Sequence, residues 1–169
     1  MKKLVLLFLS LIGISAFGQK FAFIDSDYIL NNIPTYKAAQ DQLDKYSQDW
    51  QKEIDAKYAE IDEMYKKYLA EKVLLTDDVK SKREEEIVNK EKTVKDLQQK
   101  YFGKNGDLFK KREELIKPIQ DEVYTAVKEI AADGGFAVIF DTSSGGNIMF
   151  SDPKYDKSDQ VLEKLGYKK

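Results

Sequence analysis

Two short segments of this chain carry side chains of the kinds that bind ions in other proteins. The segment Asp25-Ser26-Asp27 resembles the start of a calcium loop, but the further oxygen ligands and the glutamate at position twelve of such a loop are missing. The segment SSGG at 143–146 could cradle a phosphate, but it lacks the lysine and the following helix that phosphate-binding loops use. The sequence therefore predicts a strand-to-helix cap at the first segment and a hairpin turn at the second.

The chain contains neither cysteine nor histidine. This composition excludes disulfides, thiolate nucleophiles, the usual zinc sites and every catalytic triad that uses imidazole. Acidic side chains are frequent, but basic side chains alternate with them, and such mixed charge is the ordinary face of an exposed helix. We therefore expect no enzymatic activity, no cofactor and no metal site.

The first 18 residues have the pattern of a cleaved export signal. Lys2 and Lys3 form a basic start, residues 4–14 are largely apolar, and the small residues Ala16 and Gly18 place cleavage before Gln19. A transmembrane anchor is the alternative, but so short an apolar run does not cross a hydrocarbon layer of about 30 Å. The exit of the signal has no cysteine for a lipid anchor, so we expect a soluble mature chain.

The charge balance bears on possible partners. Without residues 1–18 the chain has 26 basic and 30 acidic residues, and the isoelectric point of the whole sequence is about 5.4. Binding to nucleic acid requires a surplus of lysine and arginine on one face. The sequence therefore predicts no nucleic-acid partner.

Most of the chain must be helical. The 68 residues between Pro34 and Gly103 include no glycine or proline, and opposite charges recur at helical spacing, as in Glu53 and Lys57. Apolar residues in the first part recur every three or four positions. They are Leu43, Tyr46, Trp50, Ile54, Tyr58, Ile61, Tyr65 and Tyr68. Those in the second part stand seven apart and then continue past Pro118. They are Ile87, Val94, Tyr101, Leu108 and Leu115, followed by Ile119, Val123, Val127 and Ile130.

These stripes predict a helical hairpin over 35–132. The run LLTDD, with Thr76 as N-cap, places the turn near 73–76, whereas a single rod through residue 132 would leave its stripe uncovered. In the first limb the spacing of Leu43, Ile54 and Tyr65 is eleven residues, so we expect the two limbs not to mesh as one regular zipper. At Gly103, Gly106 and Pro118 we expect local kinks within one domain.

The two ends of the mature chain have the pattern of strands. Strands are predicted at 21–24, 136–140 and 147–150, and a short helix at 159–165 ends before Gly166. We expect an α+β fold: residues 19–34 and 133–169 form a β-rich body, and 35–132 form a long antiparallel helical hairpin. Because so small a body cannot bury a sufficient core alone, we expect it to form by self-association. The expected core between copies comprises Phe21, Phe23, Ile24, Phe136, Val138, Phe140, Ile148 and Phe150.

The order of the segments identifies a resemblance. The export signal is followed by FAFIDSDYIL, the charged hairpin, PIQDEVYTAVKEIAADGGFAVIFD and DPKYDKSDQVLEKLG. In order and spacing the mature chain resembles the Skp/OmpH family of periplasmic chaperones. The resemblance implies a homotrimer with a barrel-like body, from which three hairpin tentacles enclose a cavity. It also implies that the cavity holds unfolded outer-membrane proteins without ATP. The best-known relatives are strongly basic, and this chain has no matching basic cluster, so contact with lipopolysaccharide or a membrane stays open.

A holding chaperone needs adaptable contacts along its tentacles. Five rings of the first limb are candidates for contact with an unfolded client, because amphipathic rings tolerate water and also cover apolar surface. They are Tyr46, Trp50, Tyr58, Tyr65 and Tyr68. The alternative for each ring is packing against the second limb. The alternative function for the whole chain is a structural or adaptor coiled coil of the cell envelope.

Overall fold

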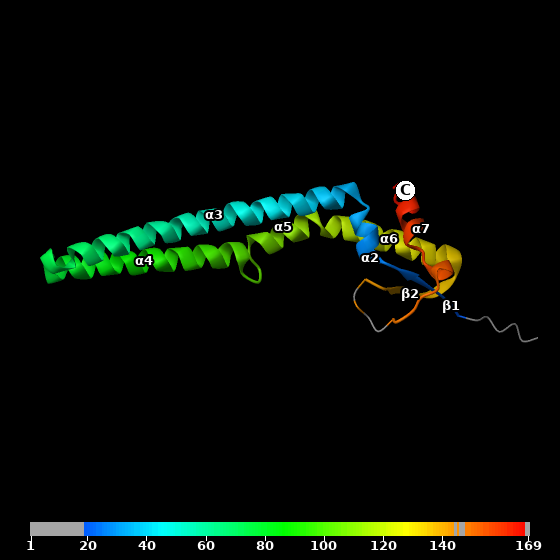
Figure 1. Ribbon diagram of the computed structural model, residues 1–169. Helices are drawn as coiled ribbons and strands as arrows, with labels where there is room; N and C mark the ends of the chain where they lie inside the picture. Colours follow the sequence, from blue (N-terminus) through cyan, green and yellow to red (C-terminus); the bar gives the residue numbers. More distant parts are fainter. Residues whose placement is uncertain (1–18, 144, 146–147, 168–169) are drawn as a thin grey trace, which may run out of the picture.

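The computed structural model describes residues 19–143, 145 and 148–167, so the predicted export signal lies outside the described residues. It consists of a long antiparallel pair of helical limbs with a small body at one end (Figure 1). The expected α+β fold, a helical hairpin joined to a small β-strand body, is confirmed for the single chain. The division of the sequence into domains stays a prediction.

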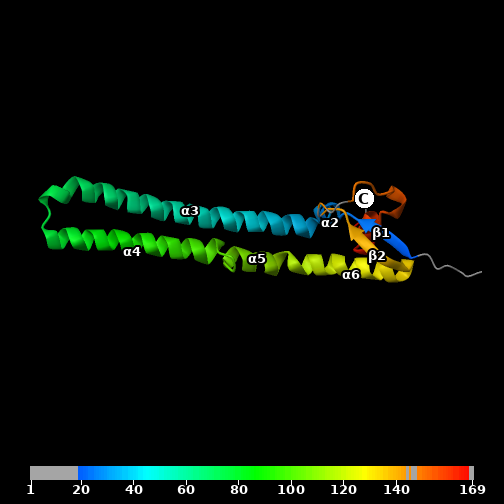
Figure 2. The same cartoon turned by 90° about the horizontal axis from the view of Figure 1, so that it is seen from below.

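The first limb is one uninterrupted helix, α3 (Pro34–Glu71), which is about 57 Å long at 1.5 Å per residue. Pro34 lies in its first turn, where the missing N–H costs no hydrogen bond. A 3-10 turn, η1 (Lys72–Leu74), follows, and α4 (Asp77–Phe102) runs back along α3 (Figure 2). Thr76 stands at the N-cap position of α4, but its hydroxyl makes no capping hydrogen bond. The chain thus reverses at 72–76, and the single-rod alternative is wrong.

The second limb consists of three helices in line, α4, α5 (Asp107–Leu115) and α6 (Lys117–Gly134). Residues 103–106 loop out between α4 and α5, with the Gly106 N–H donating to the Gly103 carbonyl at 2.8 Å. A β-carbon at Gly103 would collide with the carbonyl oxygen of Gln99, so only glycine fits this exit from α4. Both α4 and α5 pack on α3. The interruption therefore lies within one hairpin.

The limbs mesh along a regular seam in the outer half of the hairpin, and the prediction that they would not is wrong there. Ile54, Ile61 and Tyr68 stand seven apart on α3. They form one buried cluster with Ile87, Val94 and Tyr101 of α4. The eleven-residue step from Leu43 to Ile54 is one heptad plus four residues, and α3 passes the 103–106 loop within this step. Beyond the loop, Ala39 and Leu43 pack with Ile116 in a separate cluster.

The body contains a parallel two-stranded sheet of β1 (Lys20–Ile24) and β2 (Phe136–Asp141). The chain leaves α6 through Gly135, whose φ of 64° is in the left-handed region that favours glycine. Phe21 pairs with Val138, and Phe23 pairs with Phe140. In Figure 1 the sheet lies beside the end of α6, and the short α2 (Ser26–Asn31) links β1 to α3.

The predicted third strand at 147–150 is wrong for its described residues, because 148–150 have no regular structure. Two features account for this. Met149 and Phe150 are exposed, so no neighbouring surface holds the segment extended. The position next to β1 is taken instead by a later residue: Asp156 forms an isolated parallel bridge with Phe23, and the Lys157 N–H donates to the Phe23 carbonyl at 2.8 Å. Asn147 lies outside the described residues.

The body does bury a core within one chain. This core brings together β1, α2, α6 and the terminal helix α7 (Ser158–Lys164). Its buried members are Ile24, Ile29, Leu30, Ile33, Val123, Ala126, Ile130, Val161 and Leu162. The expectation that the body cannot form a core alone is therefore too strong, because α2, α6 and α7 cover one face of the sheet.

Candidate functional site

The opposite face of the two-stranded sheet is apolar and uncovered. Side chains alternate across the sheet, so Ala22, Ile24 and Ile139 face the body core. The sheet face, defined here as Phe21, Phe23, Val138 and Phe140, looks the other way. Phe21, Val138 and Phe140 each keep between 44% and 48% of their surface exposed.

The rings of the sheet face contact one another. The centroids of Phe21 and Phe23 lie 5.9 Å apart, and those of Phe23 and Phe140 lie 5.7 Å apart. Tyr155, from the 3-10 turn η2 (Pro153–Tyr155), extends this surface, because its ring centroid lies 5.3 Å from that of Phe21. The result is a contiguous aromatic surface, and contiguous exposed apolar surfaces mark interaction sites in soluble proteins.

The remaining residues predicted for the core between copies divide into two groups. Ile24 is buried in the body core, and Phe136 packs against that core, so these two side chains stabilise the single chain instead. The cause is strand alternation for Ile24 and the tight exit from α6 for Phe136, whose ring lies against Gly134. Ile148 is half-buried and Phe150 is exposed, so Phe150 remains available to a second copy.

Asp141 fixes the end of β2 to the start of α2. Its carboxylate accepts hydrogen bonds from the Ser26 N–H at 3.1 Å, the Ser26 hydroxyl at 2.6 Å and the Ser143 N–H at 3.0 Å. The neighbouring Asp25 caps α2 by accepting from the Tyr28 N–H at 2.9 Å, which confirms the predicted strand-to-helix cap. These bonds lock the edge of the sheet face in place.

The same hydrogen bonds set the acidity of Asp141. Burial by itself raises the pKa of this carboxyl, but the hydrogen bonds from Ser26 and Ser143 together lower it by more. The pKa of Asp141 therefore lies below its ordinary value in the folded chain.

Replacing Asp141 by asparagine is expected to lower the free energy of unfolding by about 1.5 to 3 kcal/mol at neutral pH, because hydrogen bonds to a charged acceptor are lost. A pKa that is lower in the folded chain gives stability that is present above the unfolded pKa of about 4 and lost as the pH falls through the folded pKa. Urea unfolding of both proteins from about pH 7 to pH 3 should therefore show the difference narrowing. A difference that stays constant with pH would assign the effect to packing.

The five predicted client-contact rings fall into three environments. Tyr46 and Trp50 are half-buried, and Trp50 is stacked between Tyr46 at 5.5 Å and Tyr101 of the second limb at 4.7 Å. Tyr68 is buried in the seam, where its hydroxyl donates to Glu84. Tyr58 and Tyr65 are 40% and 50% exposed and stand seven residues apart, so they lie on the same flank of α3.

Packing between the limbs therefore explains Tyr68 and much of the surface of Tyr46 and Trp50. Tyr68 is withdrawn as a contact candidate because its ring has almost no free surface. On the facing limb the Tyr101 hydroxyl donates to Glu53 at 2.8 Å, so each buried tyrosine joins the two limbs through a glutamate. Tyr58 and Tyr65 are the two candidates whose rings are free to meet another molecule.

The arrangement of a long hairpin on a small sheet-bearing body is matched by known proteins. A family model described as outer membrane protein (OmpH-like) matches residues 20–165, which is most of the chain. The chain belongs to the OmpH-like family.

Two similar proteins illustrate this membership. An uncharacterized protein of Aquifex aeolicus (strain VF5) is 30% identical to the OmpH-like chain over 165 residues, which is 98% of this chain and 96% of that protein. A crystal structure of an OmpH-like candidate outer membrane chaperone from Caulobacter crescentus CB15 superimposes with a TM-score of 0.68, covering 87% of this chain and 83% of the other. At 16% identity, this second likeness shows the fold alone.

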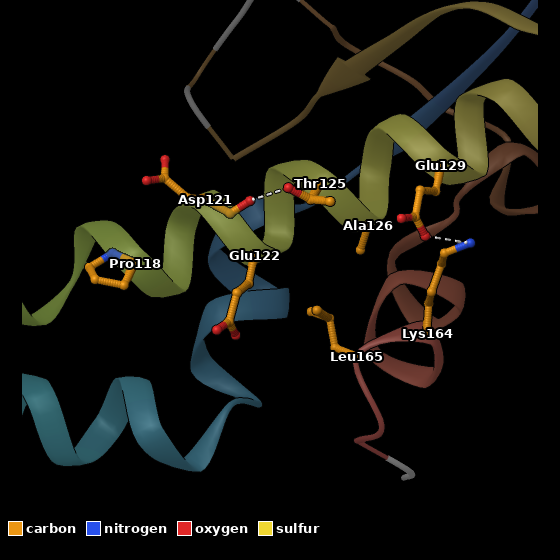
Figure 3. Close-up of a pocket in the computed structure, with 8 residues that line it drawn as sticks. All are labelled: Pro118, Asp121, Glu122, Thr125, Ala126, Glu129, Lys164 and Leu165. Carbon is orange, nitrogen blue, oxygen red and sulfur yellow. Dashed lines mark hydrogen bonds and ion pairs between the residues drawn. The ribbon is translucent and has the colours of Figure 1, made fainter.

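A shallow groove of about 500 Å³ lies between α6 and α7 of the OmpH-like chain (Figure 3). Pro118, Ala126 and Leu165 contribute apolar surface, and the rest is lined by three acidic side chains together with Thr125 and Lys164. The charges are engaged locally: Lys117 pairs with Asp121 at 2.8 Å, and Lys164 pairs with Glu129 at 2.9 Å. The groove is the shallow boundary between the packed helices α6 and α7. Its carboxylates do not converge on a common point in Figure 3.

Among the described residues, no group of three or more acidic side chains is placed to hold a metal ion. No described helix of the OmpH-like chain has the length and apolar character needed to cross a membrane. Sequence reasoning missed two contributors to the sheet face, namely Tyr155 and the anchor Asp141. Asp141 stands at the end of a predicted strand, but its hydrogen bonds with Ser26, which lies 115 residues away in the sequence, cannot be predicted from a local pattern.

Proposed function

We propose that this OmpH-like chain is an ATP-independent holdase of the periplasm that binds unfolded outer-membrane proteins between its hairpins and prevents their aggregation. The sheet face is the observation that carries the proposal. Three of its four side chains are nearly half exposed in a single chain, although they lie on the most regular part of the body. Such a surface favours self-association.

In the proposed assembly, copies associate through the sheet face, and their bodies form one apolar core. Closed symmetry then directs the hairpins to one side, where they surround a common space. Three copies are proposed because the family resemblance implies a trimer. The exposed side chain of Phe150 lies outside the body core and would add apolar surface to the interface between copies.

Client contact is assigned to the flanks of the hairpins. Tyr58 and Tyr65 offer ring surface without exposing a continuous aliphatic stripe, so the empty hairpin stays solvated. Around them, residues 55–68 of α3 carry four acidic side chains and three lysines, so this stretch has little preference for one sign of client charge. Weak contacts of this kind suit a binder of many sequences.

Replacing both Tyr58 and Tyr65 by serine is expected to raise, several-fold, the amount of protein needed to suppress aggregation of an outer-membrane protein diluted from urea. The double variant removes ring surface without touching the seam, so its unfolding transition should be unchanged. The control is Tyr124→Ser, which removes a ring that is 65% exposed, and so more exposed than Tyr58 or Tyr65, from α6 beside the body. Wild-type suppression by a fully assembled double variant would remove these rings from the mechanism.

The alternative function is a structural or adaptor coiled coil. The range of unfolded proteins that the chain protects distinguishes it from a holdase. A holdase should slow the aggregation of several unrelated unfolded membrane proteins at near-stoichiometric ratio and without ATP. An adaptor should bind one folded partner and protect none of them. Light scattering reports aggregation in each case, and protection of only one of the membrane proteins would favour the adaptor.

A further inference from the structure

Four aliphatic side chains are exposed at the end of the hairpin that lies farthest from the body. They form what we call the tip patch, which consists of Leu69, Val73, Leu74 and Val79. Val73 and Leu74 are 92% and 86% exposed, which is more than any side chain of the sheet face. Figures 1 and 2 show this turn as the outermost point of the molecule.

The local structure directs these side chains outward. In the run Val73-Leu74-Leu75, Leu75 turns inward and packs against the seam between the limbs. Val73 and Leu74 belong to the 3-10 turn η1 and point away from that seam into solvent. Leu69 stands four residues before Val73, so it lies on the same side of the helix end. The patch is therefore the cap of a narrow, convex end.

The charges around the tip patch cancel. Residues 71–84 carry four acidic and four basic side chains. Several of these are paired with one another: Arg83 with Glu71 at 3.3 Å, and Lys80 with Asp77 at 3.0 Å. A partner of the tip is therefore selected by apolar character and not by its charge.

The size and shape of the patch decide between kinds of partner. A stable protein interface buries about 1,200 Å² or more with complementary surfaces, which four side chains on a convex end do not supply. A lipid bilayer requires no complementary shape, and it accepts apolar side chains that enter the boundary between headgroups and acyl chains. Because no surplus of basic residues surrounds the tip, the lipid surface it suits is zwitterionic.

We propose that the tip patch docks end-on on a zwitterionic lipid bilayer, with Val73 and Leu74 entering the boundary between headgroups and acyl chains. This contact is shallow and leaves the hairpin outside the membrane. It is separate from client holding, which is assigned to the flanks of the hairpin, and it does not require the proposed function.

The chain has no native cysteine, so a single introduced cysteine can carry a polarity-sensitive fluorescent label. We would label Leu74→Cys and, as the matched control, Val88→Cys, which is exposed on the side of α4. Phosphatidylcholine vesicles should shift the emission of the label at 74 to shorter wavelength and increase it several-fold, whereas the label at 88 should not respond. Brominated acyl chains should quench only the label at 74. Raising the salt concentration should leave the response unchanged.

The unlabelled double variant Val73→Ser, Leu74→Ser provides the second measurement. Its binding to the same vesicles in a flotation assay should be at least tenfold weaker, a change of about 1.4 kcal/mol, while its suppression of client aggregation stays at the wild-type level. Three results would overturn the proposal: no response of the label at 74 to vesicles, a response only to an unfolded membrane protein, or a response only to anionic vesicles that high salt abolishes. Loss of aggregation suppression in all variants and the wild type would count against the proposed function alone.

Discussion

Replacing Val138 by aspartate is expected to convert the proposed assembly into monomers and to abolish the proposed suppression of aggregation. Val138 lies on β2 directly opposite Phe21 and is half exposed in the single chain, so the change is tolerated by the folded monomer. In an assembly built on the sheet face, each copy would bury an unpaired carboxylate, at a cost of about 3 kcal/mol or more per copy. Light scattering coupled to size exclusion measures the mass, and the aggregation assay measures the activity.

The matched control places the same charge on the hairpin. Val88→Asp changes an exposed valine of α4 that lies outside the sheet face, so mass and activity should match the wild type. Circular dichroism should show that both variants keep the helix content of the wild type. If Val138→Asp retained the full mass, the sheet face would not be the surface between copies. Phe140→Asp should then also leave the mass unchanged.

The hairpin could be predicted from sequence because its signals are local. A stretch free of glycine and proline, opposite charges at helical spacing and the LLTDD turn all concern residues within a few turns of one another. The meshing of the limbs could not be predicted in the same way. Tyr65 continues an eleven-residue spacing with Leu43 and Ile54, but Ile61 and Tyr68 are the residues that face α4, and only contact with the second limb separates these alternatives.

The sheet face could likewise be predicted only in part from local sequence patterns. The strands at 21–24 and 136–140 were predictable from their residue types, whereas their parallel pairing and register depend on the path of the whole hairpin. The alternation that buries Ile24 and exposes Phe21 follows from that register. For the same reason a β-prone run such as 148–150 stays irregular in the single chain, because strand formation requires a neighbour and not only suitable residues.

A substitution in the seam between the limbs is expected to lower the stability of the hairpin, whereas a substitution in the sheet face is expected to prevent assembly. Ile54 is 1% exposed and packs in the cluster of the outer hairpin, which is separate from the body core. Ile54→Ala is expected to lower the free energy of unfolding by about 2 to 5 kcal/mol, because it removes buried methyl groups and leaves a cavity. The buried apolar contacts between the limbs of the outer hairpin are confined to this one cluster, so we expect the outer hairpin to open first.

Measurements of mass, stability and aggregation suppression should distinguish the role of the seam from that of the sheet face. Ile54→Ala leaves the sheet face intact, so light scattering should report the wild-type mass, while urea unfolding followed by circular dichroism should show an earlier transition and aggregation suppression should fall. Val88→Ala, which removes exposed methyl groups from the other limb, should change the stability by no more than about 0.5 kcal/mol. A wild-type unfolding curve for Ile54→Ala would mean that the limbs do not depend on this seam. A loss of mass would mean that assembly requires closed hairpins, because the body core and the sheet face contain no part of the seam.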